Sequence, residues 1–194
     1  MNSKVHNILV SRLGRIASAH DLTMAIAESC TGGGLCSAIV ANTEASGTLE
    51  RGFVVYSIDA KCELLGLERQ RVEECAGVSE DIARAMARAA LTKSQAGLGI
   101  AITGFAGPPE GEEEVGLVHI AAARDSRSWH RELHLGEIGR EAVCKEAIRE
   151  ALELAILAAR DVRSSETTNI AFPVNDAASA PVTETASARP RYLS

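Results

Sequence analysis

The sequence has few of the residues on which nucleic-acid-binding proteins depend. Aromatic residues make up 3% of its 194 residues, and acidic side chains outnumber basic ones, which gives a net charge of −6. Few aromatic rings leave little surface for stacking on bases, and a negatively charged chain is not attracted to a phosphate backbone. We therefore expect no nucleic acid among the partners of this protein.

The cysteines and the apolar runs exclude further classes of protein. The chain has five cysteines, an odd number, and no Cys-x-x-Cys pair, so that neither a disulfide framework nor a zinc site is predicted. No apolar run is long enough to span a bilayer, and no signal peptide opens the chain. These absences predict a soluble cytoplasmic protein without a membrane partner.

The 46% of hydrophobic residues that are present suffice for one domain with a core. Their spacing predicts helices at residues 4–20, 35–41, 79–95 and 140–160, and strands at residues 23–27, 53–56, 98–103, 115–123 and 129–135. A short polar turn joins the last two strands, which must therefore be antiparallel neighbours. We predict a single-domain three-layer α/β/α sandwich with a mixed, mostly parallel sheet over residues 1–162. Residues 163–194 lack periodicity and predict a disordered tail.

A serine, a tyrosine and a lysine occur close together around the second predicted strand. Ser46 lies in a turn of small residues, Tyr56 ends the strand, and Lys61 falls in the first turn of the next helix. Ligands bind at the carboxyl ends of strands in open α/β sheets, and a neutral lysine can activate a hydroxyl as a nucleophile. The commoner roles are a serine bonded to its own turn, an exposed lysine and a structural tyrosine.

A glycine-rich turn follows the first predicted strand. Strand, turn and helix together offer backbone N–H groups to an anion, here from Thr31, Gly32 and Gly33; the alternative is that the glycines allow close packing. Cys30, near the helix N-terminus, is a rival nucleophile that we rank below Ser46. Glu28 is either a general acid or base, or a carboxylate that caps the turn.

Two further segments suit substrate binding. Thr103 and Gly104 end a predicted strand, where a hydroxyl and backbone N–H groups can bind an amide or its oxyanion; a plain strand end is about as common. Arg140 begins the last helix, where a cation opposes the helix dipole, and its fork suits a phosphate. His130 and His134 share one face of a strand, but nothing else in the sequence completes a metal site there.

Three segments, in this order, resemble the CinA C-terminal domain family. They are Ala-Glu-Ser-Cys-Thr-Gly-Gly at 27–33, Glu-Arg-Gly-Phe-Val-Val-Tyr-Ser at 50–57, and Ala-Ile-Thr-Gly-Phe-Ala-Gly-Pro at 101–108, the last followed by Val-Gly-Leu-Val at 115–118. The resemblance covers roughly residues 5–160. It implies an enzyme of pyridine nucleotide salvage that hydrolyses the carboxamide of nicotinamide mononucleotide, without a metal or organic cofactor, and that forms a dimer or higher homo-oligomer.

The resemblance also implies a set of site residues. The catalytic residues would be Ser46, Tyr56 and Lys61. The residues that bind the small-molecule nucleotide would be Ser29, Thr31, Gly32, Gly33, Thr103, Gly104 and Arg140. Two segments depart from the family pattern: Glu44-Ala-Ser46 keeps one serine of a Gly-Ser-Ser turn, and the acidic loop 109–114 lacks a Lys-Pro pair. The altered loop favours, as an alternative, a nucleotide-binding module without turnover. A weaker alternative is a serine–lysine hydrolase of another amide.

Overall fold

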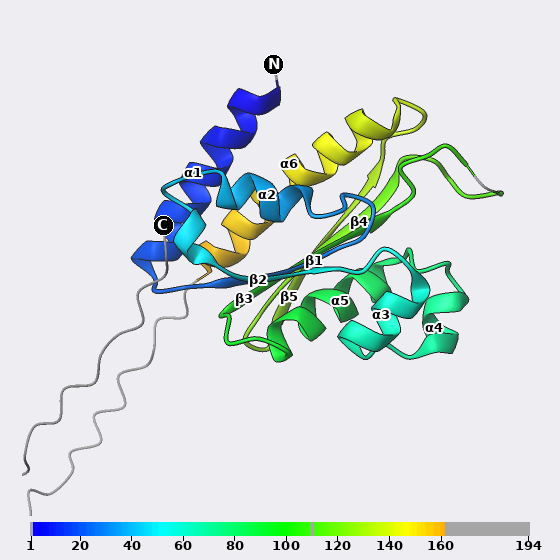
Figure 1. Ribbon diagram of the computed structural model, residues 1–194, viewed down its shortest axis with the longest axis horizontal. Coiled ribbons are helices and arrows are strands. Elements are labelled where there is room, and N and C mark those ends of the chain that lie inside the picture. Colours follow the sequence, from blue (N-terminus) through cyan, green and yellow to red (C-terminus); the bar gives the residue numbers. More distant parts are fainter. Residues whose placement is uncertain (1, 110, 162–194) are drawn as a thin grey trace, which may run out of the picture. The chain divides into compact units, whose positions relative to one another are not determined.

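The computed structural model describes residues 2–109 and 111–161, which form a five-stranded sheet with helices on both faces (Figure 1). The strands are β1 (Met24–Glu28), β2 (Leu49–Val54), β3 (Leu98–Gly104), β4 (Leu117–Arg124) and β5 (Arg127–His134). The α-helices are α1 (Asn2–Ala19), α2 (Gly34–Val40), α3 (Ile58–Leu65), α4 (Arg69–Glu73), α5 (Glu80–Thr92) and α6 (Arg140–Arg160).

The strand order is β2-β1-β3-β4-β5. β1 is parallel to both β2 and β3, whereas β4 is antiparallel to β3 and to β5. Four of these five strands therefore run in one direction. The predicted mixed, mostly parallel sheet and the predicted antiparallel pair are both confirmed.

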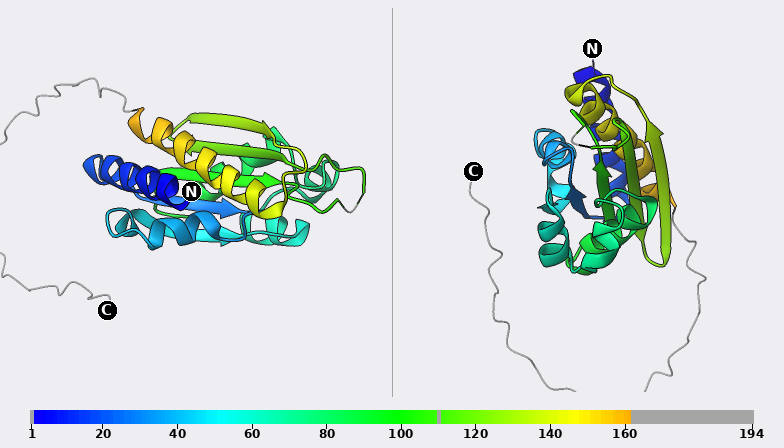
Figure 2. Two further views of the ribbon diagram at one scale, coloured as in Figure 1. Left: turned by 90° about the horizontal axis from the view of Figure 1, so that it is seen from above. Right: turned by 90° about the vertical axis from the view of Figure 1, so that its right-hand side faces the viewer.

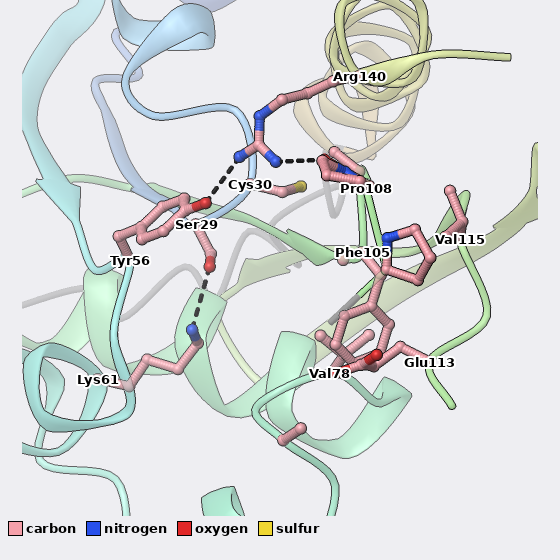
Figure 3. Close-up of a pocket in the computed structure, with 15 residues that line it drawn as sticks. Ser29, Cys30, Tyr56, Lys61, Val78, Phe105, Pro108, Glu113, Val115 and Arg140 are labelled. Atoms are coloured by element: carbon pink, nitrogen blue, oxygen red, sulfur yellow. Dashed lines mark hydrogen bonds between the residues drawn. The ribbon is translucent and has the colours of Figure 1, made fainter. Parts of the chain in front are cut away.

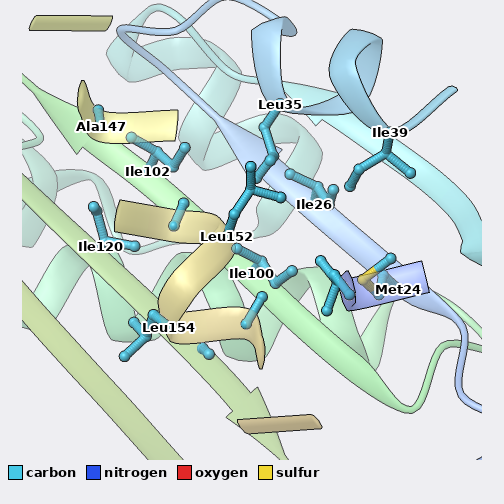
Figure 4. Close-up of a cluster of buried hydrophobic side chains, with 14 of the residues drawn as sticks. Met24, Ile26, Leu35, Ile39, Ile100, Ile102, Ile120, Ala147, Leu152 and Leu154 are labelled. Carbon is cyan, nitrogen blue, oxygen red and sulfur yellow. The ribbon is translucent and has the colours of Figure 1, made fainter. Parts of the chain in front are cut away.

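The two faces of the sheet carry side chains of different size. Residues on the face under α1, α2 and α6 are large, among them Met24, Ile26, Ile100, Ile102 and Ile120 (Figures 2 and 4). On the face under α5, the strands carry alanines, and a Cβ added at Gly99 would lie 2.2 Å from the carbonyl oxygen of Ala87. Helix α5 therefore packs directly against the backbone of the sheet.

The largest difference from the predicted elements is in β2. The apolar run 53–56 predicted a short buried strand, but β2 spans Leu49–Val54 and none of its residues is fully buried. β2 is an edge strand with β1 as its neighbour, so that polar Glu50 and Arg51 are tolerated in it. The following residue, Val55, is fully buried.

Serine caps fix the starts of the two helices nearest the carboxyl ends of the strands. Ser57 Oγ accepts a hydrogen bond from Ala60 N at 3.0 Å and begins α3, which places Lys61 in the first turn. Ser79 Oγ accepts from Ile82 N at 3.2 Å and begins α5, as predicted. Each cap satisfies one of the N–H groups that a helix start leaves unpaired.

None of the helices in residues 2–109 and 111–161 combines the length and the hydrophobicity that crossing a membrane requires. The predicted tail, 163–194, lies outside the described residues.

Candidate active site

A cavity of about 260 Å³ lies at the carboxyl ends of β1, β2 and β3 (Figure 3). Glu28 at the end of β1 is in register with Val54 of β2 and Ile102 of β3. The residues that follow these strands therefore emerge at one edge of the sheet. Ser29, Tyr56 and Gly104 all line the cavity, at the place where ligands bind in open α/β sheets.

A buried lysine and a buried serine meet at the floor of this cavity. Lys61 Nζ lies 3.1 Å from Ser29 Oγ and 3.2 Å from the carbonyl oxygen of Val55. Lys61 is 3% exposed and Ser29 is 6% exposed. Burial lowers the pKa of the Lys61 ammonium, and none of the described carboxylates forms an ion pair with it that would reverse the effect. A lysine in this setting can accept a proton from the serine hydroxyl.

The backbone at Gly77 covers the side chain of Lys61. A Cβ added at Gly77 would lie 3.2 Å from Lys61 Cε and 3.3 Å from Nζ, and its φ of +74° favours glycine. Thr103 Oγ1 donates a hydrogen bond to the Gly77 carbonyl oxygen at 2.7 Å. Thr103 is fully buried and does not line the cavity. The predicted substrate contact of Thr103 is thus replaced by a contact that holds Gly77 over the lysine.

The glycine-rich turn binds an anion, but that anion is Glu28. The fully buried carboxylate of Glu28 accepts hydrogen bonds from Thr31 Oγ1 at 2.6 Å and from three backbone N–H groups, those of Gly33 at 3.2 Å, Leu35 at 3.0 Å and Cys36 at 2.8 Å. The cap role of Glu28 is therefore correct. Thr31, Gly32 and Gly33 do not line the cavity. Glu28 accepts from Thr31 Oγ1 and Gly33 N, and Gly32 N donates to the Ser29 carbonyl oxygen at 3.0 Å, so these donors are already used within the turn.

Ser46 lies away from the cavity. It begins a short 3₁₀ helix, Ser46–Thr48, at the amino end of β2, whereas Tyr56 and Lys61 follow the carboxyl end. A six-residue strand separates its two ends by about 20 Å, and Ser46 is not among the lining residues. The prediction that Ser46 joins Lys61 is therefore wrong, and Ser29 occupies the place beside the amine. The position of Ser29 directly after a predicted strand is the signal that could have identified it.

Tyr56 and Arg140 meet over the mouth of the cavity (Figure 3). Arg140 Nη2 donates to Tyr56 Oη at 2.7 Å, and Nη1 donates to the carbonyl oxygen of Gly107 at 2.6 Å. Tyr56 is 61% exposed. Within the described residues its hydroxyl is bonded to Arg140 and not to Ser29 or Lys61. Tyr56, predicted to be catalytic with Lys61, thus forms its hydrogen bond with Arg140 instead, and Arg140 lines the cavity.

Cys30 lines the cavity but is not a thiolate. Burial, the largest cause, together with the nearby Cys144 and Glu28, raises the pKa of the Cys30 thiol to about 12. The expectation that the helix N-terminus would stabilise its thiolate is wrong because Glu28 takes the N–H groups of that terminus.

The acidic loop contributes one wall of the cavity. Pro109, Glu113 and Val115 line it, and within the described residues Glu113 Oε2 is buried without a hydrogen-bond partner. The cavity therefore combines a cation at its mouth, a carboxylate on its wall and the Ser29–Lys61 pair at its floor.

A sequence model of the CinA C-terminal domain matches residues 6–158. The chain belongs to the CinA C-terminal domain family. This membership confirms the resemblance of the three sequence segments. The nicotinamide-nucleotide amidohydrolase PncC of Escherichia coli K12 is 36% identical over 149 residues, which cover 75% of this chain and 89% of that protein. A CinA-like protein of Gloeobacter violaceus is 41% identical over 135 residues, which cover 68% of this chain and 32% of that protein.

The chain thus spans about a third of the length of the Gloeobacter relative. Solved structures share the fold. The competence/damage inducible protein CihA of Agrobacterium tumefaciens has a TM-score of 0.75 at 35% identity, covering 80% of this chain and 95% of that chain. A CinA superfamily protein of Escherichia coli has a TM-score of 0.72 at 33% identity, covering 79% of this chain and 89% of that chain.

Proposed function

We propose that this chain is an amidohydrolase that converts nicotinamide mononucleotide to nicotinate mononucleotide and ammonia, with Ser29 as the nucleophile and Lys61 as its base. The observation that carries the proposal is the 3.1 Å contact of Ser29 Oγ with a buried lysine amine in an accessible cavity. The name of the PncC relative supports the substrate, and the reaction belongs to pyridine nucleotide salvage.

In the first half of the reaction, Ser29 Oγ attacks the carboxamide carbon while the neutral Lys61 amine takes the hydroxyl proton. A tetrahedral intermediate forms, and its collapse breaks the C–N bond. The Lys61 ammonium returns the proton to the departing nitrogen, which leaves as ammonia, and an ester to Ser29 remains. General base catalysis of this kind contributes roughly 10²–10⁴-fold to a rate.

In the second half, water attacks the ester and Lys61 takes a proton from it. The C–O bond to Ser29 breaks, Lys61 returns the proton to Oγ, and the carboxylic acid product ionises in solution. The backbone N–H of Cys30, the residue after the nucleophile, is the proposed donor to the oxyanion in both halves.

The mouth of the cavity supplies recognition of the nucleotide. The guanidinium of Arg140 is held by Tyr56 and by the Gly107 carbonyl oxygen, and this fixed cation can pair with the substrate phosphate. The carboxamide would then point from the mouth to the Ser29–Lys61 floor.

Ammonia release from nicotinamide mononucleotide tests the proposal. We expect the full chain to release ammonia and nicotinate mononucleotide in equal amounts, and Ser29→Ala to reduce kcat/KM at least a hundredfold. Ser46→Ala is the matched control and should retain activity within about twofold, because the serine at the other end of β2 lies outside the cavity. Equal activity of Ser29→Ala and the unsubstituted chain would contradict the proposal.

The acidic loop favours a second candidate, a nucleotide-binding module without turnover. Glu113 adds a carboxylate to the cavity wall, which disfavours an anionic substrate in the cavity. Calorimetry that shows nucleotide binding by a chain that releases no ammonia would select this candidate.

A further inference from the structure

A second cluster of polar side chains lies outside the cavity, between α5 and the β4–β5 pair. His119 of β4 is in register with Glu132 of β5, and His130 lies two residues before Glu132. Because alternate residues of a strand share a face, these three side chains project from the same face of the sheet. Glu80, the first residue of α5, approaches the cluster from the helix.

Ligating atoms of the three residues already lie close together. His119 Nδ1 is 3.1 Å from His130 Nε2 and 3.8 Å from Glu132 Oε2, and one ligating atom of each residue lies within 4.8 Å of the others. A tetrahedral zinc ion with bonds of about 2.0–2.1 Å holds its ligand atoms about 3.4 Å apart. The cluster thus has nearly the spacing of a first coordination sphere.

Neighbouring side chains orient two of the three ligands as second-sphere groups do. The far nitrogen of His130, Nδ1, lies 3.6 Å from Glu80 Oε2, which leaves Nε2 directed at His119. The other oxygen of Glu132, Oε1, is 2.7 Å from His134 Nε2. A metal-bound histidine commonly donates its other N–H to a carboxylate, and metal-bound carboxylates are hydrogen-bonded in turn.

The two imidazoles are largely buried, and the carboxylate is accessible. The side chains of His119 and His130 are 8% and 10% exposed, whereas that of Glu132 is 43% exposed. An ion in the cluster would keep an open side toward solvent for a water ligand.

We propose that His119, His130 and Glu132 bind one divalent transition-metal ion of the Zn²⁺ or Co²⁺ type. Imidazole and carboxylate donors suit these ions. The site shares no residue with the Ser29–Lys61 cavity, and it joins the β4–β5 pair to the start of α5. A bound ion is therefore expected to raise the stability of the chain and to take no part in amide hydrolysis. The competing explanation of the contact is a hydrogen bond between two metal-free rings.

Titration of the full chain, without a histidine tag and after treatment with a chelator, tests the proposal. Co²⁺ should bind one ion per chain and give visible absorption bands without the near-ultraviolet band of a cobalt–thiolate bond. Zn²⁺ should displace the Co²⁺ and raise the Tm. The absence of stoichiometric binding at millimolar Co²⁺, or a thiolate band that places the ion on a cysteine, would overturn the proposal.

Variants distinguish the cluster from chance binding. His130→Asn and Glu132→Gln should each weaken Co²⁺ binding at least tenfold, and His134→Asn, which frees the Glu132 carboxylate, should weaken it about tenfold. His20→Asn changes an exposed histidine at the end of α1 and is the matched control, with unchanged affinity. Melting curves without metal verify that each variant folds. Equal affinity of His130→Asn and His20→Asn would show that the rings are only a hydrogen-bonded pair.

Discussion

Two serines in small-residue turns lie at opposite ends of the β1–β2 pair, with different surroundings. Beyond the carboxyl end of the sheet, Ser29 follows β1 and contacts the buried amine of Lys61. At the amino end, Ser46 begins a short 3₁₀ helix and lies outside the cavity. Because a hydroxyl becomes a useful nucleophile only beside a base, the direction of the strand decides which serine can react.

A second contrast separates the two buried ionisable groups next to Ser29. Glu28 is surrounded by four hydrogen-bond donors that satisfy its charge. Lys61 has two neutral neighbours, and burial lowers its pKa. We infer that Glu28 stabilises the turn, whereas Lys61 is held ready for proton transfer. Each prediction below tests or sharpens one of these two contrasts.

Lys61→Met should have the largest effect on activity. Loss of the base should lower kcat/KM roughly 10²–10⁴-fold, measured by ammonia release. The free energy of unfolding at neutral pH should not fall, because methionine fills the site without a desolvated amine. Lys145→Met, at an exposed position of α6, is the matched control and should retain activity. A fully active Lys61→Met chain would exclude the lysine as base.

Glu28→Gln should act mainly on stability, whereas Lys61→Met acts on activity. The carboxamide replaces one carboxylate oxygen by an N–H₂ group, which cannot accept the hydrogen bonds that this oxygen now receives. The free energy of unfolding should therefore fall by about 1–3 kcal/mol. Urea denaturation measures the change. Glu73→Gln alters an exposed carboxylate of α4 and should change the free energy by less than about 0.5 kcal/mol. Similar losses in both variants would show that the Glu28 cap does not stabilise the turn.

The pH dependence should follow Lys61. The amine must be neutral to accept the serine proton, so kcat/KM should rise about tenfold per pH unit below its pKa and then level off. Because burial lowers that pKa, the plateau should begin below the ordinary lysine range. The same shift means that the unfolded chain binds more protons between the two pKa values, so stability should rise with pH there. A kcat/KM that keeps rising up to the ordinary lysine pKa would contradict this environment for Lys61.

Tyr56→Phe should have the smallest effect. It removes the hydroxyl that accepts from Arg140 Nη2, a single exposed hydrogen bond worth about 1 kcal/mol. We expect KM to rise up to about fivefold while kcat remains unchanged. Steady-state kinetics separate the two constants. A hundredfold fall in kcat would show instead that Tyr56 takes part in the chemical step.

The sequence was sufficient to predict the fold and to predict which edge of the sheet carries the site. Periodicity predicted α6 at its observed bounds, and the short turn after β4 predicted the antiparallel pair. The partner of Lys61 could not be predicted from spacing along the chain, because Ser29 is distant in sequence and lies beside it only after β1 and β2 pair.

Of two other contacts, one is local and one is not. The Glu28 carboxylate fills the N–H cluster of the turn that follows it, and the sequence offered this cap as one of two roles for Glu28. His119 completes the histidine cluster from a neighbouring strand, whereas the spacing of His130 and His134 suggested a pair on one strand. Side chains that meet across strands leave no local signal in a single sequence.

Trapping the acyl-enzyme tests the central claim most directly. The full chain is mixed with nicotinamide mononucleotide, quenched in acid within milliseconds, and digested with trypsin. The peptide 16–51 contains both Ser29 and Ser46, so fragmentation between them locates the ester by mass. Our account predicts the nicotinoyl nucleotide ester on Ser29, and its absence after Lys61→Met. An ester on Ser46, or ammonia release with no ester on Ser29 under any quench time, would contradict it.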